Sequence, residues 1–277
     1  MKAIALLLLL SIGQVNSPAD NDEEHPVIRS SSKVFIDSAP SSLNTISRSE
    51  LSNRFETPSL NASSDSAFKE LLTEINSRKP IPELGVGEKG KKYDVILQPG
   101  HYLRTKGAVG TQGALTSEQA LAAFITGEIA KNLRKAKKSV LVISADQYLH
   151  PSHSTGSFDG LQSTIFLAIH ADGSAHPCST GPSMAYQVRT SPLAMHAIGL
   201  GLADALGYDY TDFRKDNYTV NEGHYYMFRN VQTDRLNGLL EVGELTCNQS
   251  ELRLIGSSRM IGANVARAIE FLLHSSE

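Results

Sequence analysis

Four side chains in this sequence could together perform hydrolytic chemistry. His101, Glu118 and His170 offer two imidazoles and one carboxylate, and Glu241 offers a second carboxylate within an apolar run. Two His and one carboxylate make an open zinc site with a fourth position left for water. The bound ion lowers the pKa of that water to about 7. A second carboxylate, which does not bind the metal, can pass the water's proton to a leaving amine. These residue types therefore predict Zn²⁺-dependent hydrolysis of an amide or ester, with Glu241 as the base.

The hydrophobic pattern from about residue 90 onward predicts the scaffold that would hold these residues. Short segments that are apolar throughout alternate with longer segments that place apolar residues on one face of a helix. Such a pattern is typical of a mostly parallel sheet covered on both faces. We therefore predict a single α/β domain with a mostly parallel sheet flanked by helices on both faces. Strands are expected at 95–97, 140–144, 164–169, 185–188 and 239–243, and helices at 117–138, 193–206 and 257–273.

The predicted strands bring the candidate residues to one edge of the sheet. His101 follows the first strand, His170 ends the third, and Glu241 lies in the last. Ligands of open α/β sheets bind outside the carboxyl ends of the strands. Glu118 stands in the first turn of the helix that follows the glycine-containing loop 107–113, which would bring it back towards His101.

Each of these residues also has an ordinary structural explanation. His101 follows Pro-Gly and could shape a turn, Glu118 could complement a helix dipole, and His170 could be a hydrogen-bonded core histidine. Glu241 is harder to explain in this way, because an unpaired buried carboxylate is costly. Four such groups at one sheet edge favour a functional site.

The motifs around these residues resemble a known family. The sequence is similar to the zinc-dependent N-acetylmuramoyl-L-alanine amidases of the type 3 family over roughly residues 93–272. The resemblance implies zinc ligands at His101, Glu118 and His170, a catalytic glutamate at Glu241, and peptidoglycan as substrate. The segments that carry it are Gln98–His101, Gly107–Gly110, Gly113, Glu118, Leu167–Asp172, Leu239–Gly243 and Asn248.

The sequence also departs from the family's pattern. Gln98 replaces the usual Asp, Tyr102 and Leu103 replace glycines, and Gln119 replaces the usual Lys. A typical Arg is missing from 146–162. No proposed ligand is lost, so hydrolysis remains the leading expectation. Two alternatives stay open: a non-catalytic peptidoglycan-binding or regulatory protein on an amidase scaffold, and a zinc peptidase acting on short peptides.

The N-terminal part of the chain predicts export. Residues 1–19 have one basic residue, a short apolar run and small residues at the end, as in a signal peptide. Residues 20–90 read as a Ser-rich linker with a short helix at about 66–77, and residues 91–277 as the zinc amidase catalytic domain. The expected location is the periplasm or the outside of the cell.

Composition excludes several other classes of protein. A formal charge of −3 argues against nucleic-acid binding, and the sequence has no apolar run long enough to span a membrane. In an oxidising compartment Cys178 and Cys247 could form a disulfide, or they could be two unrelated buried thiols. The need for a protein activator is left open.

Two groups of polar residues have no assigned role. The segment 209–235 contains His224, Tyr225 and Tyr226 and could line the cleft, or it could be a solvated loop with a short helix. Three histidines in expected loops could offer a fourth ligand, although such residues are usually ordinary surface residues: His150, His153 and His176.

Overall fold

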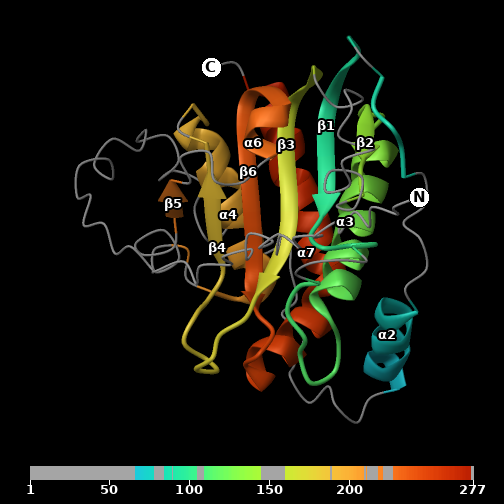
Figure 1. Cartoon of the computed structure of the whole chain (residues 1–277), viewed down its shortest axis with the longest axis vertical. Coiled ribbons are helices and arrows are strands. Elements are labelled where there is room, and N and C mark those ends of the chain that lie inside the picture. Colours follow the sequence, from blue (N-terminus) through green and yellow to red (C-terminus); the bar gives the residue numbers. More distant parts are fainter. Residues whose placement is uncertain are drawn as a thin grey trace, which may run out of the picture. The chain divides into compact units, whose positions relative to one another are not determined.

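The computed structural model contains a central sheet of six strands in the order β2-β1-β3-β6-β4-β5 (Figure 1). The residues that the structure describes are 66–77, 84–88, 90–104, 109–144, 160–187, 189–208, 210, 218–220 and 227–275. The strands are β1 Lys92–Pro99, β2 Val140–Val142, β3 Leu161–Asp172, β4 Ser183–Tyr186, β5 Tyr218–Val220 and β6 Val231–Glu244. The helices are α2 Ser66–Asn76, α3 Glu118–Lys135, α4 Pro192–Leu206, α6 Met227–Asn230 and α7 Asn248–His274.

The sheet is mostly parallel, as the alternation of strands and helices predicts. β1 pairs in parallel with β2 and β3, and β3 pairs in parallel with β6. β4 runs antiparallel to β6, and β5 is parallel to β4. The prediction of a mostly parallel α/β fold is therefore confirmed.

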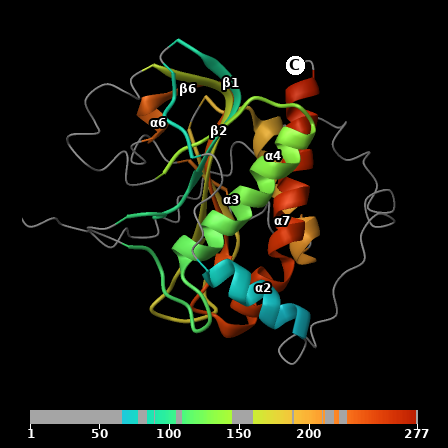
Figure 2. The same cartoon turned by 90° about the vertical axis from the view of Figure 1, so that its right-hand side faces the viewer.

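Helices cover both faces of the sheet. α3, α4 and α7 lie on one face, and the short α6 lies on the other (Figure 2). Along β3, Ile165, Leu167 and Ile169 belong to the larger hydrophobic cluster, whereas Phe166 and Ala168 belong to the cluster that includes α6 residues. This alternation follows from the two-residue period of a strand, and it explains why residues 165–169 are all apolar.

The two elements that differ most from the sequence pattern, β6 and α7, both begin earlier than predicted. β6 begins at Val231 rather than near residue 239; residues 232–235 are exposed or half-buried and form no apolar run that would reveal a strand. α7 begins at Asn248 rather than near Ser257. Its first turns carry polar residues, and one of them, Glu251, is buried.

No helix in the described ranges is long and apolar enough to cross a membrane.

A disulfide settles the open question about the cysteines. Cys178, in the segment after β3, is bonded to Cys247, which immediately precedes α7. The buried carboxylate of Glu244 holds the same segment, since it accepts hydrogen bonds from the N–H groups of Cys178 and Thr180, each at 2.8 Å. The β3–β4 connection is therefore fixed to the start of α7 next to the carboxyl ends of β3 and β6.

Removal of the disulfide should destabilise the protein measurably. The bond joins residues 69 positions apart, and its loss restores chain entropy to the unfolded state. We expect the Cys178→Ala/Cys247→Ala double variant to lose about 2–4 kcal/mol of unfolding free energy, measured by urea denaturation. An unchanged denaturation midpoint and slope would contradict this expectation.

Candidate active site

His101 is positioned by a tight turn at the end of β1. Its φ of 52° lies in the left-handed region, which non-glycine residues adopt at a conformational cost. The preceding Gly100 donates its N–H to Ile169 O at 2.7 Å, which ties this turn to β3. A Cβ at Gly100 would lie 2.5 Å from the His170 ring, so glycine is needed for the two histidines to approach.

Glu118 is the first residue of α3 and is held by groups from two other segments. Its Oε2 accepts the N–H of Thr111 at 2.8 Å, and its Oε1 accepts the N–H of Ala171 at 3.3 Å. The backbone N–H of Glu118 in turn donates to Thr111 O at 2.9 Å. Gly110, at φ +85°, lies so close that a Cβ there would be 2.7 Å from Glu118 Oε2. The start of a helix also favours a carboxylate.

His101, Glu118 and His170 form one compact cluster. Glu118 Oε1 lies 2.9 Å from His170 Nδ1 and 3.6 Å from His101 Nε2. The two imidazole rings are arranged edge to face, with centroids 5.1 Å apart. One potential ligand atom from each residue lies within 4.8 Å of the others, a spacing at which all three could hold one metal ion.

The environment of Glu118 favours its charged form. Burial alone would raise the pKa of this carboxyl group, but the hydrogen bond with His170, the positive charge available on His170 and His101, and the N–H of Thr111 outweigh burial. The net effect is a lowered pKa for Glu118. The cluster therefore presents an ionised carboxylate beside two imidazoles.

Glu241 stands opposite His170 in the register of β3 and β6. Its Oε2 atom is buried and has no hydrogen-bond partner among the described residues. Burial, followed by the negative charges of Glu118 and Asp172, raises the pKa of Glu241 well above its ordinary value. The two glutamates of the site therefore have opposite pKa shifts.

The candidate residues line one cavity of about 360 Å³. The sequence predicted that His101, Glu118, His170 and Glu241 lie at one sheet edge, and the structure brings them together in this cavity. That prediction assigned no role to Thr111 or Asp172, which also line the cavity. The sequence does place both residues near the predicted site, since Thr111 lies in the glycine-containing loop and Asp172 lies two residues after His170. The lining residues are His101, Val109, Gly110, Thr111, Glu118, His170, Ala171, Asp172 and Glu241.

The departures from the family's pattern do not alter the cluster itself. Gln98 and Tyr102 are buried, and neither lines the cavity. Leu103 is 47% exposed at a φ of 60°. Gln119 donates from Nε2 to Val109 O at 2.9 Å, so it holds the loop before α3.

The structure describes only part of the other polar candidates, which are the loop histidines and segment 209–235. His176 is exposed and does not line the cavity. His150, His153 and the residues 224–226 lie outside the described part of the chain. Of segment 209–235, the structure describes Tyr210, the short strand β5, the short helix α6 and the start of β6.

Several solved structures are similar to this chain. An N-acetylmuramoyl-L-alanine amidase from Clostridium difficile 630 is 17% identical, with a TM-score of 0.49, over 67% of this chain and 99% of that one. The catalytic domain of the amidase CwlV from Bacillus (Paenibacillus) polymyxa is 24% identical, with a TM-score of 0.49, over 66% and 98%. The amidase AmiC2 of Nostoc punctiforme is 18% identical, with a TM-score of 0.47, over 69% and 100%.

Sequence comparison gives a clear family assignment. No curated protein sequence matches the chain. The family model of the N-acetylmuramoyl-L-alanine amidases, however, matches residues 95–270, which is more than half of the sequence and includes every member of the His-Glu-His cluster as well as Glu241. The chain therefore belongs to the N-acetylmuramoyl-L-alanine amidase family.

Proposed function

We propose that this protein is an exported zinc amidase that hydrolyses the bond between N-acetylmuramic acid and L-alanine, with His101, Glu118 and His170 as zinc ligands and Glu241 as the catalytic base. The observation that carries the proposal is the clustering of the three ligand atoms within 4.8 Å beside a buried carboxylate oxygen that has no hydrogen-bond partner among the described residues. Family membership supports peptidoglycan as the substrate.

The donor set fits zinc. Two imidazole nitrogens and one carboxylate oxygen are typical ligands of catalytic zinc, whereas Mg²⁺ and Ca²⁺ prefer sites made of oxygen atoms. When bound, zinc would polarise the scissile carbonyl group and lower the pKa of a water molecule. The N–H groups of Thr111 and Ala171 keep Glu118 oriented towards the two histidines, as partners of metal ligands commonly do.

Glu241 is suited to proton transfer. In the absence of a cation its pKa is raised by burial and by the negative charges of Glu118 and Asp172. A nearby cation offsets that repulsion, which brings the pKa towards the range in which a carboxyl group can both take and give a proton at neutral pH. In this role Glu241 accepts a proton from the attacking water and donates it to the amine of the departing L-alanine.

Two features support export. Cys178 and Cys247 are joined in a disulfide, which persists in oxidising compartments. The substrate of the family is the cell wall, which lies outside the cytoplasm. The proposed organisation therefore keeps a signal peptide at 1–19, a Ser-rich linker at 20–90 and the catalytic domain at 91–277, with the mature protein in the periplasm or outside the cell.

Substitutions should separate metal binding from proton transfer. We expect Glu241→Gln to keep one zinc per chain and to lose about 10²–10⁴-fold in kcat, because it removes the base and leaves the ligands. His101→Ala should lose both zinc and activity. Metal content is measured by elemental analysis, and turnover by release of stem peptide from purified peptidoglycan.

The exposed residue Glu88, which pairs with Lys91, offers a matched control in Glu88→Gln. This control should behave as wild type in both assays. A Glu241→Gln protein that hydrolyses peptidoglycan at the wild-type rate would disprove the assigned role of Glu241. A folded wild-type protein that binds no zinc when zinc is supplied would disprove the metal site.

Glu241 should also affect the stability of the metal-free protein. Because its pKa is raised in the folded state, the folded protein keeps a proton that the unfolded chain releases, so stability should fall as the pH rises above the ordinary value of 4.5. Glu241→Gln removes this titration and should therefore be more stable than wild type at pH 7, with a difference that shrinks at pH 5. Urea unfolding of both proteins in chelator at pH 5 and pH 7 would measure this. A Glu241→Gln protein equal to or less stable than wild type at pH 7 would refute the expectation.

A further inference from the structure

Helix α2 lies outside the region that matches the family model, yet it packs against the catalytic domain. The match covers residues 95–270, whereas α2 spans Ser66–Asn76. Phe68 and Ile75 on its apolar face are 7% and 2% exposed and belong to the same hydrophobic cluster as residues of α3 and α7. The helix predicted within the linker is thus part of the packed structure.

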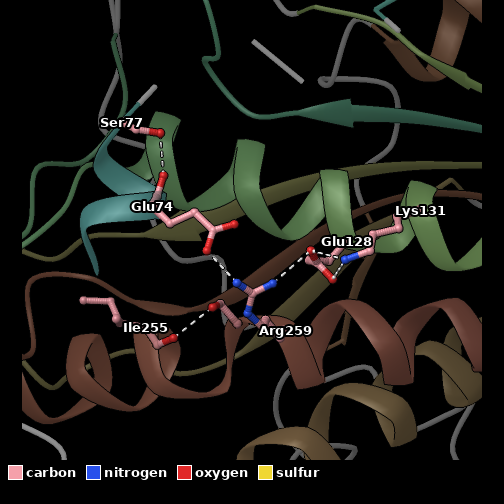
Figure 3. A network of polar contacts seen from close by, with 7 residues as sticks. Glu74, Ser77, Glu128, Lys131, Ile255 and Arg259 are labelled. Carbon is pink, nitrogen blue, oxygen red and sulfur yellow. Dashed lines mark hydrogen bonds and ion pairs between the residues drawn. The ribbon is translucent and has the colours of Figure 1, made fainter. Parts of the chain in front are cut away.

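Polar contacts fix the orientation of α2 on the domain (Figure 3). Arg259 of α7 contacts Glu74 of α2, with Nη2 and Oε2 2.5 Å apart, and Glu128 of α3, with Nη1 and Oε1 3.3 Å apart. One guanidinium therefore bridges all three helices. Exposed ion pairs contribute little free energy. We therefore assign the main stabilisation to the apolar face and the alignment to Arg259.

The last residue of α2 contacts the loop that precedes Glu118. Asn76 donates from Nδ2 to Leu115 O at 2.9 Å, and its Oδ1 accepts the hydroxyl of Thr116 at 2.7 Å. The two partners are adjacent residues, so one amide group holds both a carbonyl and a side chain of this loop. Thr116 is only 2% exposed, and its hydroxyl would lose this partner if Asn76 were absent.

The same loop is held from the other side by α7. Glu251 accepts the N–H groups of Ala114, Leu115 and Thr116 at 3.1, 2.8 and 2.9 Å. The backbone of the loop is thus fixed from two directions immediately before α3 begins. Thr116 is separated from Glu118 by one residue, so a shift of this segment moves the start of α3.

From these contacts we infer that Asn76 is a positioning residue for Glu118, which makes α2 part of the active-site scaffold. It acts by fixing Leu115 and Thr116, not by touching the substrate or a metal. The inference depends on the proposed role of Glu118 as a metal ligand. A purely structural α2 would instead contribute to global stability without affecting the position of Glu118.

Hydrogen exchange in the metal-free full-length protein tests the inference without any assay of activity. The amide protons of Thr111 and Ala171 are donated to the Glu118 carboxylate, so their exchange rates report where that side chain lies. In Asn76→Ala we expect exchange at both amides, measured by NMR, to accelerate about three- to tenfold, the factor expected for loss of a hydrogen bond. The amides of β1 and the amides of β3 other than Ala171 should exchange at the wild-type rate.

Thr73→Ala is the matched control, because the Thr73 hydroxyl donates to Lys69 O within α2 itself. It should leave the exchange rates of Thr111 and Ala171 unchanged. Two results would overturn the inference: unchanged exchange at both amides in Asn76→Ala, or uniform acceleration that includes β1 and the other amides of β3. The second result would mean that Asn76 acts only on global stability.

Zinc affinity provides the second measurement, by competition with a chromophoric chelator. The zinc dissociation constant of Asn76→Ala should rise about three- to tenfold, and that of Thr73→Ala should not change.

A double variant provides a further check. As a single substitution, Thr116→Val should weaken zinc binding. In the Asn76→Ala background it should have no additional effect, because both substitutions remove the same contact. Additive effects, or an unchanged affinity in Asn76→Ala, would also overturn the inference. If the wild-type protein binds no zinc, the metal-site proposal fails, and the exchange at Thr111 and Ala171 still decides whether Asn76 positions Glu118.

Discussion

The site depends above all on the hydrogen bonding of the Glu118 carboxylate. This one group joins the loop before α3, through the N–H of Thr111, to the end of β3, through Ala171 and His170. His101, which follows β1, and His170, near the end of β3, both contact the same oxygen of this carboxylate. The glycine at position 110 matters for the same reason, since a larger residue would displace this carboxylate.

The second constraint is the proximity of two buried carboxyl groups. Glu118 has donors that stabilise its charge, whereas Glu241 has burial and negative neighbours that oppose its charge. Neighbouring acids with opposite pKa shifts are a common way for one site to separate the roles of ligand and proton carrier. This electrostatic asymmetry matches the roles proposed above for Glu118 as a ligand and Glu241 as the proton carrier.

The sequence predicted that these four residues lie together, because they stand near strand ends and at a helix start, which local patterns reveal. It predicted less where stability comes from distant partners. The exposed first half of β6 has no apolar run, and Glu251 resembles a surface acid in a helix that starts earlier than expected. α2 was predicted as a helix, but its packing could not be, because Arg259 lies 185 residues from Glu74. The pairing of the cysteines likewise remained open until their geometry was known.

The disulfide has a consequence for the resistance of the chain to proteases. A single cut in the chain between Cys178 and Cys247 would leave the two fragments covalently joined. His170 and Glu241 lie on paired strands whose contact does not require an intact connection between them. A nicked molecule would therefore keep the two halves of its cavity together.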